Sequence, residues 1–95
     1  MKKLLSIFDA FLLPNNKLVL GGINSNLDNL WAQEMKELIK GKHLILKRPG
    51  LDDITLNVLD VEVTNSLIDQ KNFFFLINEN LSPKDIIKNS IIYYE

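Results

Sequence analysis

The first apolar segments of the chain alternate with turn signals in a way that predicts a hairpin followed by an irregular strand. Residues 4–13 are rich in Leu, Ile and Phe and end at Pro14-Asn15-Asn16, a cluster typical of turns. Residues 17–20 resume the apolar run, so the two segments are expected to pair. Gly21-Gly22 follows within the second strand, which indicates a bulge or the close approach of another backbone.

The next segment has the period of a helix. Its apolar residues are Leu27, Leu30, Trp31, Met35, Leu38 and Ile39. This spacing predicts an amphipathic helix of about three turns, with Asn26 or Asp28 as N-cap and Gly41 just beyond its end. Trp31 lies on the apolar stripe, so it is expected to anchor the helix in the core.

The second half of the chain returns to strand patterns. Residues 42–47 form a short apolar run closed by the turn Pro49-Gly50. Alternation begins at residue 54 and changes phase at Val58-Leu59, which predicts a bulge there. Residues 73–77 are apolar on both phases, which predicts a strand covered by the core on one face and by the helix around Trp31 on the other.

The last elements are a single helical turn and a closing strand. Ser82 is a suitable N-cap, with Pro83 at the first helical position and Asp85 at the third. Residues 91–94 form the final strand. The pattern as a whole predicts a mainly β fold, a single domain spanning residues 1–95: a small six-stranded antiparallel β-barrel with one amphipathic helix inserted after strand 2.

The order of these segments resembles domain II of the translational GTPases, the β-barrel of elongation factor Tu and its relatives. The resemblance is carried by residues 10–23, 38–46, 59–63, 73–77 and 82–93. It implies a translation-factor barrel that binds RNA, ribosomal components or neighbouring proteins. Asn89-Ser90 departs from the family, which usually has a glycine there, and residues 27–39 are longer and more helical than the usual connection. No GxxxxGK[ST] is present, so the resemblance implies no GTPase activity.

Composition excludes several kinds of chemistry. The 95 residues are 46% hydrophobic and 24% charged, as in a soluble globular domain. Cysteine is absent, which excludes disulfides and thiolate sites, and the one histidine excludes a two-histidine metal site. The serines lack a nucleophile-elbow context. We therefore expect a protein that is not an enzyme and has no metal or small-molecule cofactor.

The start of the chain imitates a secretory signal. Asp9 breaks its apolar run, however, and no small-x-small cleavage site precedes Pro14. No apolar run approaches the length of a membrane span, so we expect a cytoplasmic protein with no membrane partner.

Charge divides the chain into two candidate binding surfaces. Residues 1–48 carry a net charge of +4 and residues 49–95 carry −5, although the total is only −1. The candidate basic patch comprises Lys40, Lys42, His43, Lys47 and Arg48. The alternative acidic patch comprises Asp52, Asp53, Asp60 and Glu62.

These surfaces support two hypotheses. The first is a non-catalytic binding module of the translation-factor type that recognises RNA or a protein through the basic patch. If the last strand is an edge, Tyr93 or Tyr94 would add a ring on which bases stack. The second is a small immunity- or antitoxin-type inhibitor whose acidic patch neutralises a basic toxin. Exposed strand edges of a small barrel could also pair with a partner strand.

Overall fold

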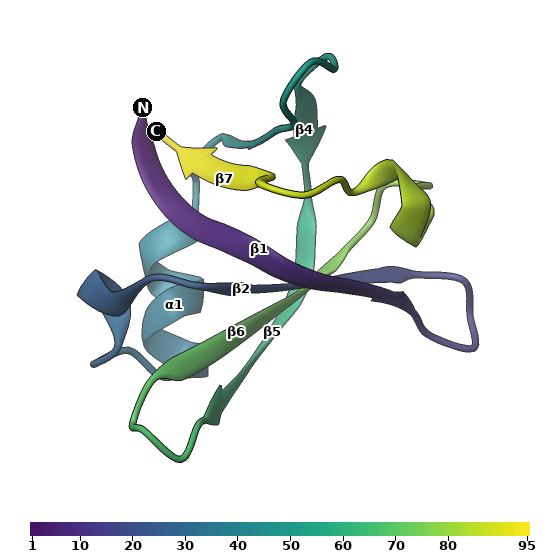
Figure 1. Cartoon of the computed structure of the whole chain (residues 1–95). Coiled ribbons are helices and arrows are strands. Elements are labelled where there is room, and N and C mark those ends of the chain that lie inside the picture. The colour runs from purple at the N-terminus through teal and green to yellow at the C-terminus, as the bar shows by residue number, and fades with distance from the viewer.

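One antiparallel sheet, curled into a half-barrel, forms most of the computed structural model, which describes residues 1–95 (Figure 1). The strands are β1 (Lys2–Leu12), β2 (Leu18–Ile23), β3 (Leu44–Lys47), β4 (Ile54–Leu56), β5 (Val58–Asn65), β6 (Lys71–Ile77) and β7 (Ile91–Tyr94). The helical segments are the 3-10 turns η1 (Ser25–Leu27) and η2 (Pro83–Asp85), and the helix α1 (Ala32–Ile39) between β2 and β3. The predicted mainly β fold is confirmed, but the sheet has seven strands, not six.

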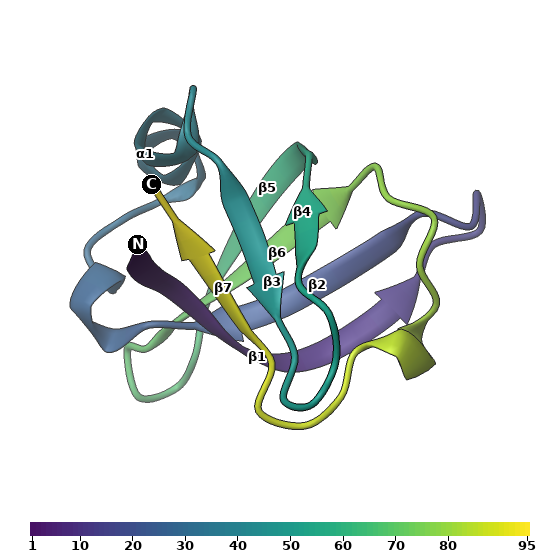
Figure 2. The ribbon, with the colours of Figure 1, turned by 90° about the horizontal axis from the view of Figure 1, so that it is seen from above.

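The extra strand arises at Asn57, where one long extended segment changes partner. The sheet order is β4-β3-β7-β1-β2-β6-β5, so the two edge strands are consecutive in the chain and only Asn57 separates them. The Asn57 N–H and side-chain amide both donate to the Glu79 carboxylate at 2.8 Å, and the Asn57 carbonyl accepts from the Asn78 N–H. These bonds hold the bend between β4, which pairs with β3, and β5, which pairs with β6 (Figure 2).

Bulges let the strands bend around the core. The predicted bulge at Val58-Leu59 is confirmed, because Leu59 has no partner on β6. β1 has two bulges, at Leu4 against β7 and at Phe8 against β2. Leu4 and Leu5 are both fully buried, although neighbouring residues of a regular strand face opposite sides.

The predicted hairpin and the close approach at the paired glycines are also confirmed. β1 and β2 pair through a turn in which Asn16 has a φ of 65°. A Cβ on Gly22 would lie 2.8 Å from the Cβ of Leu5, and one on Gly21 would lie 2.9 Å from the ring of Phe74. Any larger residue would push these neighbours apart.

The helix is shorter than predicted, and its start was misplaced. The eight residues of α1 make just over two turns, and Trp31 is the N-cap residue. Asn26 and Asp28 do not cap it: Asn26 lies in η1, and the Asp28 carboxylate accepts from the N–H of Lys71. Gly41 follows the helix with a φ of 72°, as predicted.

Trp31 is not the core anchor that the sequence predicted. It precedes the first helical residue in an extended conformation, which takes its side chain off the apolar stripe, and it is 50% exposed. Its ring packs instead against the ammonium group of Lys71, 4.3 Å from the ring centroid. Met35 is the residue of α1 that enters the core fully.

The core lies inside the curled sheet. Thirteen buried apolar residues form one cluster, with Phe73, Phe75 and Ile77 of β6 at 0% exposure. The sequence predicted that the helix would cover the outer face of β6, and this prediction is wrong. Phe74 points outward and meets Phe8 and Phe11 of β1 instead.

Candidate functional site

The basic residues singled out by the sequence do not form one patch. Lys40, Lys42 and His43 are exposed in the connection between α1 and β3, whereas Lys47 and Arg48 lie at the opposite end of β3. The first group follows the C-terminal end of α1, where the helix dipole favours cations without any ligand. The five residues therefore offer no continuous path for a phosphate backbone.

Arg48 is held by the fold. Its two terminal nitrogens donate to the backbone carbonyls of Asp85 (3.0 Å) and Asp52 (2.9 Å). The guanidinium thereby joins the β3–β4 turn to η2. Ser82 holds the N-cap position of η2, as predicted, and the Asp85 carboxylate accepts from the Ser82 N–H. The Ser82 hydroxyl has no hydrogen-bond partner.

Lys47 contributes to a small basic and aromatic surface. Its ammonium lies 5.7 Å from the centroid of the Tyr93 ring and 3.7 Å from a carboxylate oxygen of Asp53. Lys3 is directly opposite Tyr93 on β1, so the two side chains share a face. β7 lies between β3 and β1, however, so the strand that carries Tyr93 and Tyr94 is not the edge that a stacking site was expected to need.

The acidic residues also separate into two places. Asp52 and Asp53 lie in the β3–β4 turn, where the Asp53 carboxylate pairs with Lys47 and the backbone carbonyl of Asp52 accepts from Arg48. Asp60 and Glu62 point outward from β5, on a different part of the molecule. The two charged surfaces therefore interleave, and neither is continuous.

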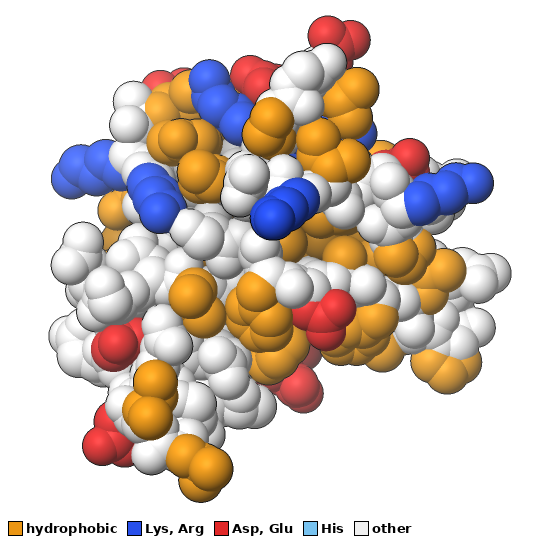
Figure 3. All heavy atoms as spheres, in the orientation of Figure 1, with side chains coloured by type: hydrophobic (Ala, Val, Ile, Leu, Met, Phe, Trp, Pro, Cys, Tyr) orange, Lys and Arg blue, Asp and Glu red, His pale blue; other side chains and the backbone are white.

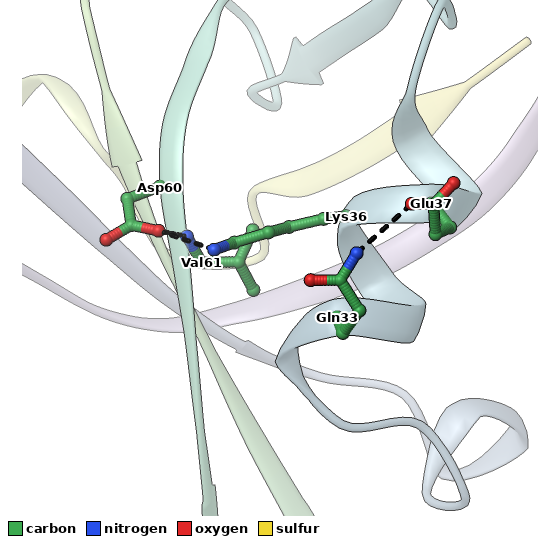
Figure 4. Close-up of polar contacts among 5 residues, drawn as sticks. All are labelled: Gln33, Lys36, Glu37, Asp60 and Val61. Carbon is green, nitrogen blue, oxygen red and sulfur yellow. Dashed lines mark hydrogen bonds and ion pairs between the residues drawn. The ribbon is translucent and has the colours of Figure 1, made fainter.

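Asp60 has the most constrained carboxylate of these. One of its oxygens lies 3.0 Å from the ammonium of Lys36 on α1 and also accepts from the Val61 N–H at 2.8 Å (Figure 4). The hydrogen bond from Lys36, together with the one from Val61, holds the pKa of Asp60 below its ordinary value. Asp60 thus stays ionised at neutral pH and ties β5 to the helix.

A third surface, which the sequence did not predict, is an exposed aromatic face. Phe74 of β6 makes an edge-to-face contact with Phe8 at 6.1 Å and a tilted contact with Phe11 at 6.3 Å. Phe8 is 51% exposed and Phe11 38%. The rings of Phe74 and Phe8 pack over Gly21, whose missing side chain leaves room for them.

An apolar groove of about 320 Å³ adjoins these rings on the outer side of β1, β2, β6 and β5. Its apolar lining is Phe11, Leu13, Val19, Phe74 and Leu76, and Asp60, Glu62 and Thr64 complete it. We call the three rings and this groove the aromatic face. Figure 3 shows apolar side chains gathered on the side that β1 crosses, with acidic side chains among them.

The aromatic face consists of cross-strand rows that end in carboxylates. One row runs from Phe11 through Val19 and Leu76 to Asp60. The next runs from Gly21 through Phe74 to Glu62. Phe8 and Phe11 are three residues apart, a spacing that puts side chains on opposite faces of a regular strand. The bulge at Phe8 brings both rings outward, and only the pairing of β1 with β2 reveals that bulge.

No group of three or more potential ligands among His, Cys, Asp and Glu side chains comes together to hold a metal ion. No helix is long and apolar enough to cross a membrane. Neither a protein-family model, nor a curated protein, nor a solved structure matches the chain. The geometry of the surfaces therefore carries the functional argument.

Proposed function

We propose that this protein is a non-catalytic module that binds another protein through the aromatic face. The observation that carries the proposal is the trio of Phe8, Phe11 and Phe74, which remains partly exposed on the outside of the sheet. Contiguous exposed apolar surface of this kind marks binding sites in soluble proteins. Phenylalanine is also enriched at the centres of protein interfaces, where rings bury much area with little loss of side-chain entropy.

The charge at the border of this face favours a basic protein as the partner. Glu62 forms no ion pair. Asp60 pairs with Lys36, but about half of its side-chain surface stays exposed to solvent. Lys17 lies at one end of the same face and donates to Asn78. A partner whose apolar side chains are flanked by cations would satisfy Glu62 on binding. This arrangement supports the immunity- or antitoxin-type inhibitor, in which the module covers a basic protein.

The proposed architecture is a translation-factor type barrel that acts in the cytoplasm. Two observations support it. The edge strands β4 and β5 meet at Asn57, as expected of a barrel that comes close to closing. Asn89, where the family usually has glycine, has a φ of 68°, a conformation that glycine and asparagine adopt most easily.

A second candidate function is the recognition of single-stranded RNA. Lys3, Lys47 and Tyr93 favour it, because they place a ring between two cations on the outer side of β1, β7 and β3. This surface is smaller, and Lys47 is already paired with Asp53. Protein binding is therefore the first proposal and RNA binding the second.

Capture of partners from native cells, with and without RNase, separates the two. The protein-binding proposal predicts an RNase-resistant complex that is lost in Phe8→Ser and kept in Leu59→Ser. Leu59 is a matched control, because it is also a bulge residue and is 53% exposed, close to the 51% of Phe8. Recovery that disappears with RNase and with Lys47→Ala would instead establish the RNA function.

A further inference from the structure

We infer that the occupant of the aromatic face is a cationic amphipathic helix presented by the partner, an inference that rests on the proposed protein-binding function. Three features lead to it. Each neighbouring strand edge has one donor already bonded to an aspartate, the width of the face matches a helix, and the carboxylate of Glu62 has no cation.

Each strand edge beside the aromatic face has one N–H that is already bonded to a side chain, which disfavours the addition of a partner strand. The N–H of Val61 on β5 is already bonded to Asp60 at 2.8 Å. On β1, which pairs with β7 only up to Ser6, the N–H of Ala10 is bonded to Asp9 at 2.9 Å. A carboxylate in front of an edge donor removes a bond that an added strand would need and repels its carbonyls. The occupant therefore lies on the face rather than beside it.

The dimensions of the face suit a helix. Three strand spacings separate β1 from β5 in the order β1-β2-β6-β5, which amounts to about 14 Å. An α-helix with its side chains is about 10–12 Å across. Its apolar stripe would rest on Val19, Phe74 and Leu76, with the rings of Phe8 and Phe11 along one side. Helix-in-groove recognition of this kind uses apolar anchors spaced by three and four residues.

The charge of the face specifies cations beside that stripe. Glu62 ends the row that contains Phe74 and has no cation of its own. Asp60 ends the adjacent row, and its partner Lys36 approaches from α1. A lysine or arginine one turn from an apolar anchor would reach Glu62. A second copy of this chain would bring Glu62 and Asp9 toward the same carboxylates, so charge disfavours self-pairing.

The test uses designed helical peptides and the whole protein. One peptide carries leucines at positions i, i+3, i+4 and i+7 flanked by lysines, and the other carries glutamates in place of the lysines. Isothermal titration should show binding of the lysine peptide only. Glu62→Lys and Phe8→Ser should each weaken that binding by about tenfold or more, as for a central contact of a small interface. Glu95→Lys and Leu59→Ser are the matched controls and should leave it unchanged.

The outcomes separate this inference from the proposed function. Equal binding of both peptides, or binding that survives Glu62→Lys in a variant shown to be folded by circular dichroism, would overturn the cationic helix. So would concentration-dependent self-association lost in Phe8→Ser. If neither peptide binds but native cells still yield a protein that depends on Phe8, the inference fails and the protein-binding function stands. If capture of the native protein also does not depend on Phe8, both the cationic-helix inference and the proposed function fail.

Discussion

Among single residues, the bulges at Phe8 and Leu59 have the same hydrogen-bond pattern. Phe8 and Leu59 each lack a partner on the adjacent strand, and each is followed by an aspartate, Asp9 or Asp60. That aspartate accepts from the N–H of the next residue, at 2.9 Å for the first and 2.8 Å for the second. These two N–H groups lie on strand edges with no further strand beside them, and the aspartate satisfies each within its own strand.

The pKa of Asp60 leads to a pH-dependent prediction. Because it is lowered on folding, ionised Asp60 stabilises the folded state above the ordinary carboxyl pKa of about 4, and this contribution is lost as the pH falls through the lower folded value. Asp60→Asn should reduce the free energy of unfolding at pH 7 by roughly 0.2–1 kcal/mol, because the Lys36 pair is exposed.

Urea unfolding of both proteins across the pH range checks this. The difference between them should shrink toward zero in acid, where wild-type Asp60 is protonated too. Lys36→Met should show the same trend from the other partner. A difference that stays constant from neutral pH into acid would contradict the assigned role of the ionised carboxylate.

Arg48 provides a prediction that separates structure from binding. Because its guanidinium donates to the carbonyls of Asp85 and Asp52, Arg48→Ala should lower the free energy of unfolding by about 2 kcal/mol. Lys47→Ala should change it by less than about 0.5 kcal/mol, since its ion pair with Asp53 is exposed. Thermal unfolding measures both. Equal stability of the two variants would show that Arg48 does not join the turn to η2 in solution.

At the scale of elements, β2 depends on its glycines. Gly22→Ala would place a Cβ 2.8 Å from the Cβ of Leu5 and 3.0 Å from the carbonyl oxygen of Ser6, so β1 and β2 would have to separate. We expect a loss of about 1–3 kcal/mol, typical of overpacking a close contact. Gly41→Ala, where a Cβ meets nothing within 4 Å and only the positive φ is strained, should cost less, about 1 kcal/mol. Denaturant unfolding that ranks them in the opposite order would contradict this packing.

The sequence predicted those elements whose signals are local. The hairpin turn, the phase change at Leu59 and the C-terminal glycine of the helix follow from turn residues and periodicity, and the structure has all three. The break at Asn57 did not follow, because it comes from a change of partner strand. Trp31 was misplaced because the helical spacing of apolar residues begins before Ala32, the first residue that is helical.

The candidate site was less predictable than the fold. The alternation of apolar and polar residues from 59 to 63 places Asp60 and Glu62 on one strand face, as the structure has them. It does not show that Asp52 and Asp53 lie beside Lys47 and Arg48. The aromatic face escaped prediction because four strands contribute to it and because the bulge at Phe8 changes the phase of β1. Cross-strand neighbours of this kind carry no signature in a single sequence.

At the scale of the whole molecule, the curled sheet presents two different outer surfaces. The side formed by β1, β2, β6 and β5 carries the aromatic face with its acidic border, and the side formed by β3, β7 and the start of β1 carries Lys3, Lys47 and Tyr93. Both termini lie side by side, where Lys2 pairs with Tyr94. A tag or fused domain attached at the termini would lie away from the strand segments that carry Phe11, Phe74 and Glu62. The protein can therefore be labelled there without covering the proposed site.

A protein partner seated on the aromatic face would lie within reach of a side chain at position 8. Photo-cross-linking in native cells tests it most directly, with p-benzoylphenylalanine introduced at position 8 or, as the matched control, at position 59. Both are exposed bulge residues, but only position 8 belongs to the aromatic face. We expect a cross-link from position 8 to one protein and none from position 59. Cross-linking from position 59 alone, or from position 8 to RNA, would contradict it.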